Sequence, residues 1–528
     1  MNYPVWYLPS IGGGTLIALI AVTHVFVSHF AVGGGLYLVL TERKARREGS
    51  AELLEFVRRH AKFFLILTLV FGSLSGVGIW FVIALVQPAG TSLLIHNFVF
   101  GWATEWVFFL VEIVAITIYY YAFERMEART HMTVGWIYFG FAWLSLFIIN
   151  GIITFMLTPG GWSETGNFWA GFLNPTFWPS LVFRTFIALA LAGVFAFLTT
   201  AFSKSGEIKR RMTRYSGWWA LAPLAASLPA GWWYVKSLPP KAQKMVEGAN
   251  PVIQAALDHG GYALAALALL VVVFALVLPR FHNKVLAVVM LSLALASMGA
   301  FEWTRENARR PYVVNGGDGV LYSSGIWVGE MERIDKAGFL GSARWTAQKD
   351  VHEESLVEAG EEIFKFQCYA CHTVGGLNND ILPLTAQMDS ETMRGYLERI
   401  HEIRYFMPPF AGTDEEARAL SAFIVKGLHG KEAPKAGQEG ESGTDADKEK
   451  GADAGEDVFE NNCAMCHTLT GGSNPLLPKV EGWSRGRIRD ALDKLTELNP
   501  AMPPLQASKR EKDQLADFLV SQIQGGRS

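Results

Sequence analysis

Long apolar stretches fill the first 303 residues of this 528-residue chain and limit what it can fold into. Each is long enough to cross a hydrocarbon layer roughly 30 Å thick as a helix. Lipid offers the backbone no hydrogen-bond partners, so a spanning segment of this kind must be helical. The sequence therefore predicts an all-α membrane bundle of about eight transmembrane helices, near residues 15–40, 61–86, 98–123, 133–157, 179–202, 216–238, 260–278 and 284–303.

Lysine and arginine gather in every second loop, after the first, third, fifth and seventh stretches. Loops rich in these residues stay on the cytoplasmic side. The sequence thus predicts a multi-pass protein of a bacterial inner membrane, with its N-terminus and C-terminal part on the outer, periplasmic side. A net charge of -3 indicates no nucleic-acid partner. The basic residues are Arg43, Lys44, Arg46, Arg47, Arg58, Arg59, Lys62, Arg125, Arg129, Lys204, Lys209, Arg210, Arg211, Arg214, Arg280 and Lys284.

The polar C-terminal part contains a tandem repeat. Residues 359–372 read AGEEIFKFQCYACH, and residues 454–467, which lie 95 positions later, read AGEDVFENNCAMCH. The residues between the copies are almost free of apolar side chains, which is typical of a flexible linker. We therefore predict a membrane domain (1–310), a connecting segment (311–354), two small α domains (355–429 and 454–528) and a linker (430–453).

Each copy carries the residues that a covalently bound c-type haem requires. Two thiols three positions apart reach the two vinyl groups of a porphyrin, and the next histidine lies under the iron. A methionine 35 positions after that histidine supplies the second axial ligand in both copies. A Cys-x-x-Cys pair alone also fits a zinc knuckle or a redox dithiol, but the repeated histidine and methionine favour haem. The predicted ligands are Cys368, Cys371, His372 and Met407, and Cys463, Cys466, His467 and Met502.

These two domains resemble class I cytochrome c. Met388 and His401 are rival axial ligands in the first copy, but only Met407 and Met502 occupy equivalent positions of the repeat.

Ionisable side chains are rare in the apolar stretches, where they usually face a cofactor or the protein interior. His24 and His29 lie in the first stretch, Glu105 and Glu112 in the third, and Arg184 in the fifth. We expect the histidines at stretch ends to be solvated. The outer end of the eighth stretch carries Glu302, Arg305, Glu306, Arg309 and Arg310, and the histidines at stretch ends are His60, His96, His131, His259 and His282.

Several motifs in the membrane part resemble subunit I of the cytochrome bd-type quinol oxidases. In ALIAVTHVFVSHFAVG, His24 matches a haem-ligating histidine and Gly33 the glycine that follows it; TEWVFFLVE resembles the family's glutamate-containing helix; and ENARRPY resembles its Glu-x-Gly-Arg-Gln-Pro-Trp motif. The resemblance implies a catalytic di-haem site near the outer face, built by His24, Glu105 or Glu112, Glu306 and Arg309. It implies one or two non-covalent haems, haem b and the family's haem d being the alternatives.

The chain also departs from that family. Arg184 stands where the family has the histidine that ligates its low-spin haem b, and His29 stands where it usually has proline. The quinol-binding loop is reduced to about residues 239–259, with Lys241 and Glu247 as remnants. Arginine cannot ligate iron, so we expect the low-spin haem to be missing.

These features predict a multihaem oxidoreductase that takes electrons at two outer c-type haems from a soluble periplasmic carrier. The electrons pass to the membrane di-haem site, which reduces a small acceptor, most simply oxygen. One alternative is a non-catalytic conduit that links membrane quinol to periplasmic carriers, and another is a mere membrane anchor. Whether a second membrane subunit takes part stays open.

Overall fold

The computed structural model describes residues 3–249, 251–315, 319–386, 388–431, 453–464, 467–470, 475–498, 502, 505 and 507–525. The chain divides into two compact units. The membrane unit contains Thr15–Glu247 and Val252–Leu321, and the polar unit contains Met1–Gly14, Gly248–Pro251 and Tyr322–Ser528.

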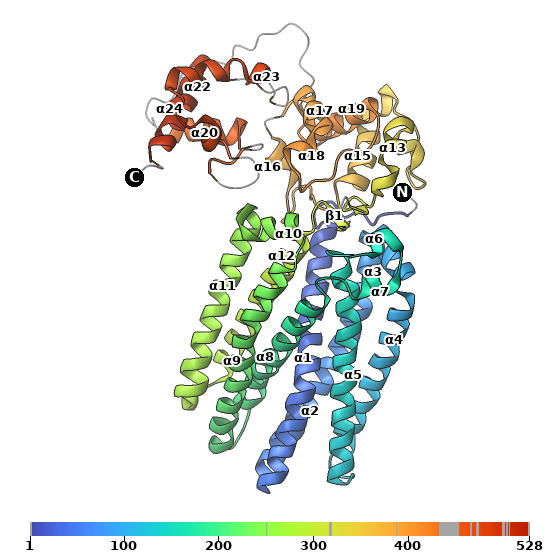
Figure 1. Ribbon diagram of the computed structural model, residues 1–528, viewed down its shortest axis with the longest axis vertical. Coiled ribbons are helices and arrows are strands. Elements are labelled where there is room, and N and C mark those ends of the chain that lie inside the picture. Colours follow the sequence, from blue (N-terminus) through green and yellow to red (C-terminus); the bar gives the residue numbers. More distant parts are fainter. Residues whose placement is uncertain are drawn as a thin grey trace. The chain divides into compact units, whose positions relative to one another are not determined.

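Long helices that run side by side form the membrane unit (Figure 1). Short helices connect some of them, and a two-stranded sheet follows the last one. The long helices are α1 (Gly13–Glu48), α2 (Ala51–Leu65), α3 (Ser73–Val86), α4 (Pro88–Tyr121), α5 (Ala128–Phe155), α8 (Phe177–Ala201), α9 (Gly206–Lys236), α11 (Pro251–Val271) and α12 (Lys284–Ala308). The short elements are α6 (Trp162–Thr165), α7 (Phe168–Phe172), α10 (Pro240–Lys244), β1 (Tyr312–Val314) and β2 (Leu321–Tyr322).

Short segments of other helical geometry join or extend several of these helices. A π-helical segment, Ile66–Gly72, joins α2 to α3, and another, Val272–Val277, extends α11. Two shorter segments, Met245–Ala249 and Pro279–Phe281, are π-helical and 3-10 helical.

Seven of the described helical stretches are long and apolar enough to cross a membrane, against about eight expected from the sequence. The difference is α9, a long helix at the position of the sixth predicted span. Its residues are rich in Trp, Gly, Ser and Pro, including Pro223 and Pro229 inside the helix, so its mean hydropathy is lower. The helical membrane bundle is confirmed.

Two glycines allow neighbouring helices to approach closely. A Cβ atom at Gly33 of α1 would lie 1.9 Å from the carbonyl oxygen of Ala188 in α8. A Cβ atom at Gly193 of α8 would lie 2.4 Å from the carbonyl oxygen of Ser216 in α9. Small residues at such crossings let backbones pack directly, which is how membrane helices gain contact area.

The polar unit repeats one helical arrangement twice. Isolated bridges join Thr373 to Asp380 and Thr468 to Pro475, 95 positions apart. The first copy contains α15 (Leu356–Gln367), α16 (Ile381–Thr385), α17 (Ser390–Glu398), α18 (Ile400–Ile403) and α19 (Asp414–Ala422), which a π-helical segment, Phe423–Leu428, extends. The second contains α20 (Asp453–Asn462), α21 (Leu477–Val480), α22 (Arg485–Leu492), α23 (Leu495–Leu498) and α24 (Lys509–Gly525). The 3-10 segments Val328–Glu330 and Glu353–Ser355 and the helices α13 (Met331–Ala337) and α14 (Phe339–Ser342) precede the first copy.

The first and last helices of each copy cross at a glycine. A Cβ atom at Gly360 would lie 2.0 Å from the carbonyl oxygen of Ala419, and one at Gly455 would lie 2.4 Å from that of Gln514. An aromatic pair completes each crossing, Phe364 with Phe423 and Phe459 with Phe518, at centroid distances of 5.5 and 6.0 Å. The duplication seen in the sequence is therefore a duplication of the fold.

The N-terminal segment packs against the first copy. The backbone N–H of Leu8 donates to the Tyr369 hydroxyl (3.1 Å), and that of Val374 donates to the Pro9 carbonyl (2.9 Å). The Tyr7 and Tyr369 rings meet edge to face at 5.0 Å. Residues close to the start of the chain thus belong to the same unit as the first Cys-x-x-Cys-His motif.

Candidate haem sites

The first Cys-x-x-Cys-His motif lies in a tight turn that ends α15. The backbone N–H groups of Cys371 and His372 both donate to the Cys368 carbonyl, at 3.0 Å. Burial, together with the neighbouring Cys371, raises the pKa of the Cys368 thiol to about 12. The two sulfur atoms therefore lie close together, with the first in an apolar pocket, as attachment to one porphyrin edge requires.

The orientation of His372 suits an iron ligand. Its Nδ1 lies 3.0 Å from the backbone carbonyl of Asn379, to which it donates. A ring that donates from Nδ1 carries its lone pair on Nε2, and metal-ligating histidines are usually fixed in this way.

The rival axial ligands of this copy lie in different surroundings. Met388 is only 4% exposed and belongs to the apolar core of the domain. His401 donates from Nδ1 to the carbonyl of Met407 itself, at 2.6 Å. Met407 is half-buried at the end of a turn in which its N–H donates to Arg404. These contacts favour Met407.

The second copy repeats this arrangement as far as it is described. The N–H of His467 donates to the Cys463 carbonyl at 2.8 Å, and Cys463 borders the core of this copy. Met502 is half-buried, and Cys466 lies outside the described residues. The donor types and the turn geometry of the first copy fit a covalent haem c, and the described part of the second copy agrees with it.

His24 is oriented by the neighbouring helix segment. Its Nδ1 lies 2.9 Å from the Ser75 hydroxyl of α3. Its ring faces Gly76, where a Cβ atom would approach within 3.2 Å of the histidine Cε1. A half-buried imidazole that is held at one nitrogen fits the haem-ligand role that the resemblance implies.

Glu105 and Glu112 lie two turns apart on α4. Glu112 is buried, whereas Glu105 is half-buried. Ser145 of α5 approaches both carboxyl groups. No hydrogen bond of ordinary geometry forms, so Glu112 Oε1 and the Ser145 hydroxyl have no partner among the described residues. Buried polar atoms without partners are rare and indicate a functional position.

Glu306 lies at the end of α12 and forms ion pairs. Its carboxylate contacts the Arg309 guanidinium and lies 3.7 Å from Arg310 Nη2. Arg309 also donates to the carbonyl of Val313, so it connects α12 to β1. The Glu306 side chain is 37% exposed. Two cations compete with any iron atom for this carboxylate, so its role as a ligand stays a prediction.

The described residues do not bring the predicted membrane ligands into one cluster. Among them, no group of three His, Cys, Asp or Glu side chains converges as a metal ion would require. His24, Glu112 and Glu306 each have a separate environment. The roles of these residues as haem ligands therefore stay predictions.

Arg184 is the centre of a buried polar network. It is 2% exposed, and its Nη1 donates to Glu302 Oε1 at 2.9 Å and lies 3.4 Å from His29 Nε2. Arg305 donates to the other oxygen of Glu302, also at 2.9 Å. His29 thus contacts the arginine that replaces the family's haem-ligating histidine. A largely apolar cavity of about 310 Å³ adjoins His29 and Arg184.

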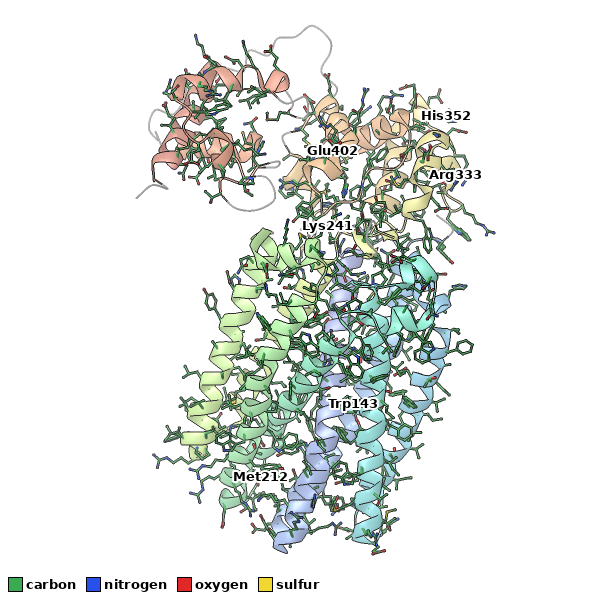
Figure 2. The ribbon with its side chains drawn as sticks, viewed as in Figure 1. Trp143, Met212, Lys241, Arg333, His352 and Glu402 are labelled. Atoms are coloured by element: carbon green, nitrogen blue, oxygen red, sulfur yellow. The ribbon has the colours of Figure 1, made fainter. Side chains whose placement is uncertain are left out.

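The expectation that the histidines at stretch ends are solvated needs correction. His60, His131 and His282 are fully buried instead of solvated, and all three form hydrogen bonds. Their neighbours from other helices cover the stretch ends, which a single sequence does not reveal. Lys241 is exposed at one end of the bundle (Figure 2), and Glu247 pairs with Lys236 at 2.8 Å.

Comparisons with known proteins agree with both halves of this description. Residues 15–245 match the family described as cytochrome bd terminal oxidase subunit I. Residues 355–424 and 450–519 match the family described as cytochrome c oxidase, cbb3-type, subunit III. A solved structure, the bd oxidase from Geobacillus thermodenitrificans, is 16% identical, with a TM-score of 0.49, and the match covers 58% of this chain and 89% of that one. No curated protein matches.

The helix bundle, the repeated Cys-x-x-Cys-His domains and these matches define a membrane-bound multihaem oxidoreductase of respiratory electron transport. More particularly, residues 15–245 are similar to subunit I of the cytochrome bd terminal oxidases, and two segments similar to cytochrome c domains follow them.

Proposed function

We propose that this protein takes electrons from a soluble periplasmic carrier at its two c-type haems and passes them to a membrane haem site that reduces oxygen. The observation that carries the proposal is the contact of Arg184 with His29 and Glu302. A salt-bridged guanidinium stands where the resembled family ligates its quinol-side haem. Loss of that haem, combined with two added cytochrome c domains, favours a change of electron donor from quinol to a soluble protein.

The membrane residues support a site for a small ligand. When bound, a high-spin haem supplies an iron with an open position, which oxygen reduction requires. Within this chain, His24 would hold the iron, and Glu105 and Glu112 would hold and transfer protons beside it. Glu306 and Arg309 would set the charge at the outer end of α12.

The proposed sidedness has independent support. The N-terminal segment contacts the first cytochrome c domain, as expected if the N-terminus and both c-type haems lie on the periplasmic face. The basic loops would then face the cytoplasm.

Carbon monoxide binding tests this function. Reduced wild-type protein should bind carbon monoxide at a non-covalent haem, and His24→Ala should lose that binding while it keeps both c-type haem spectra. His259→Ala is the matched control, because His259 is exposed on α11. If His24→Ala binds carbon monoxide normally, or if quinol reduces the c-type haems directly, the proposal is wrong and the conduit takes its place.

A further inference from the structure

A second buried polar cluster lies where α1, α4 and α5 meet. Its centre is Glu42, which is fully buried although it stands in the basic stretch TERKARRE. The Tyr119 hydroxyl donates to Glu42 Oε2 at 2.6 Å, and Arg46 Nε donates to Oε1 at the same distance. His131 Nδ1 lies 2.9 Å from Oε1.

Both nitrogens of His131 face acceptors. While Nδ1 faces the Glu42 carboxylate, Nε2 lies 2.8 Å from the backbone carbonyl of Tyr119. A neutral imidazole has one N–H and cannot donate to both. The cluster must therefore hold an additional proton, either on His131 or on Glu42. His131 is fully buried, so this proton is stored away from bulk solvent.

The cluster continues into two lines of polar side chains that face each other. On α4, Tyr119, Glu112 and Glu105 recur every seven residues. On α5, His131, Tyr138 and Ser145 recur at the same spacing. Seven residues are two helical turns, about 10.5 Å, so each set lies on one face of its helix.

The packing of α4 against α5 brings the two lines together. His131 contacts Tyr119 at the first level. Tyr138, whose hydroxyl donates to the Ala31 carbonyl at 3.3 Å, lies two turns further along α5. Ser145 approaches both Glu112 and Glu105. Trp143, which lies on the same part of α5, is labelled near the middle of the bundle in Figure 2.

We propose that Glu42, His131 and Tyr119 form the intake of a proton path that runs between α4 and α5, through Tyr138, to Glu112. This inference rests on the proposed function, because reduction of one oxygen molecule to two waters consumes four protons together with the four electrons from the c-type haems. Arg46, whose side chain is 27% exposed, connects the cluster to the face that carries the basic loops.

The path begins at the proton shared by His131 and Glu42 and ends at Glu112 Oε1, which has no hydrogen-bond partner among the described residues. Transfer along it moves a proton from this pair towards Glu112. The gap of two turns exceeds one hydrogen bond, so Tyr138 and water molecules would carry the proton between them. The cluster would then take up a new proton from the cytoplasmic side.

The test uses full-length haem-loaded protein in vesicles with a pH dye inside. A membrane-impermeant reductant outside selects molecules whose c-type haems face outwards. Anaerobic reduction of the wild type should make the interior more alkaline. Glu42→Gln, His131→Gln and Tyr119→Phe should each slow this uptake by about 10²-fold, the usual scale for loss of a proton-transfer group. Glu42→Asp should recover it.

His60→Gln is the matched control, because His60 is equally buried but bonds Thr199 of α8. Spectra of the c-type haems and of the membrane haem show that each variant is folded, and Tyr119→Phe removes only one hydroxyl.

Proton uptake at the wild-type rate in the folded variants would overturn the path, even if the protein consumes oxygen. Proton uptake by the wild type from the outer side would overturn it too. Wild-type protein that takes up protons through the cluster but consumes no oxygen would instead refute the proposed function alone.

Discussion

The predicted axial methionines would set the potential at which electrons enter the c-type haems. Replacing Met407 by histidine should lower the potential of the first haem by part of the roughly 0.8 V range that axial ligands cover. The weak absorption band of methionine-ligated iron should lose the contribution of this haem. A redox titration followed at the haem c absorption and at this weak band checks both expectations. Met388→Leu is the control, because Met388 packs in the core; an effect of this control equal to that of Met407→His would reassign the ligand.

Substitution of Gly360 tests the crossing of α15 and α19 in the first cytochrome c domain. A methyl group there would lie 2.0 Å from the carbonyl oxygen of Ala419. Gly360→Ala should therefore lower the free energy of unfolding by about 1–3 kcal/mol, the usual cost of overpacking. Gly395→Ala, in the open on α17, should stabilise slightly, since glycine inside a helix costs roughly 0.5–1 kcal/mol. Denaturant unfolding followed at the haem band compares them, and equal midpoints would contradict the crossing.

The sequence can propose residues for a covalent haem because these residues are local. Cys368, Cys371 and His372 are nearly contiguous, and the repeat identified Met407. The contact of His29 with Arg184 spans 155 positions, so no spacing rule could reveal it. Glu42 was missed because its basic neighbours indicate a surface. The polar side chains that recur every seven residues on α4 and α5 could have predicted the two polar lines.

At the scale of elements, α8 combines a close crossing with a buried charge. Arg184→Met would leave Glu302 buried with Arg305 as its remaining cation. Removal of one partner of a buried ion pair costs about 3–5 kcal/mol. Thermal inactivation of haem binding should therefore occur at a lower temperature in Arg184→Met, whereas Arg184→Met combined with Glu302→Gln should recover most of the loss. A single variant as stable as the wild type would show that this pair does not hold α8 to α12.

The apolar stretches of the sequence predicted where the membrane helices lie, but not where they begin and end. The expected third span begins at residue 98, whereas α4 begins at Pro88 and passes through a non-helical Phe98. Hydropathy identifies residues that lipid can cover, and a helix continues beyond them wherever other helices satisfy its polar groups. The less apolar α9 shows the reverse, since a helix packed tightly against α8 needs less apolar surface.

In the whole molecule, the proposed electron path runs from two cytochrome c domains to a membrane haem site of the same chain. The repeat, the bundle and the two-unit division follow from the sequence and the fold. The direction of electron flow depends on which haem binds oxygen. Neither the membrane domain nor the cytochrome c domains determine this direction alone.

Rapid mixing of the fully reduced protein with oxygen is the most direct test of the proposed path from the c-type haems through the membrane site to oxygen. Absorption of the c-type haems reports their oxidation, and His24→Ala is compared with the wild type at equal haem c content. We predict that the c-type haems of the wild type are oxidised rapidly while oxygen is consumed, and that those of His24→Ala stay reduced. Equally fast oxidation in both proteins would contradict the account, because electrons would then reach oxygen without the membrane site.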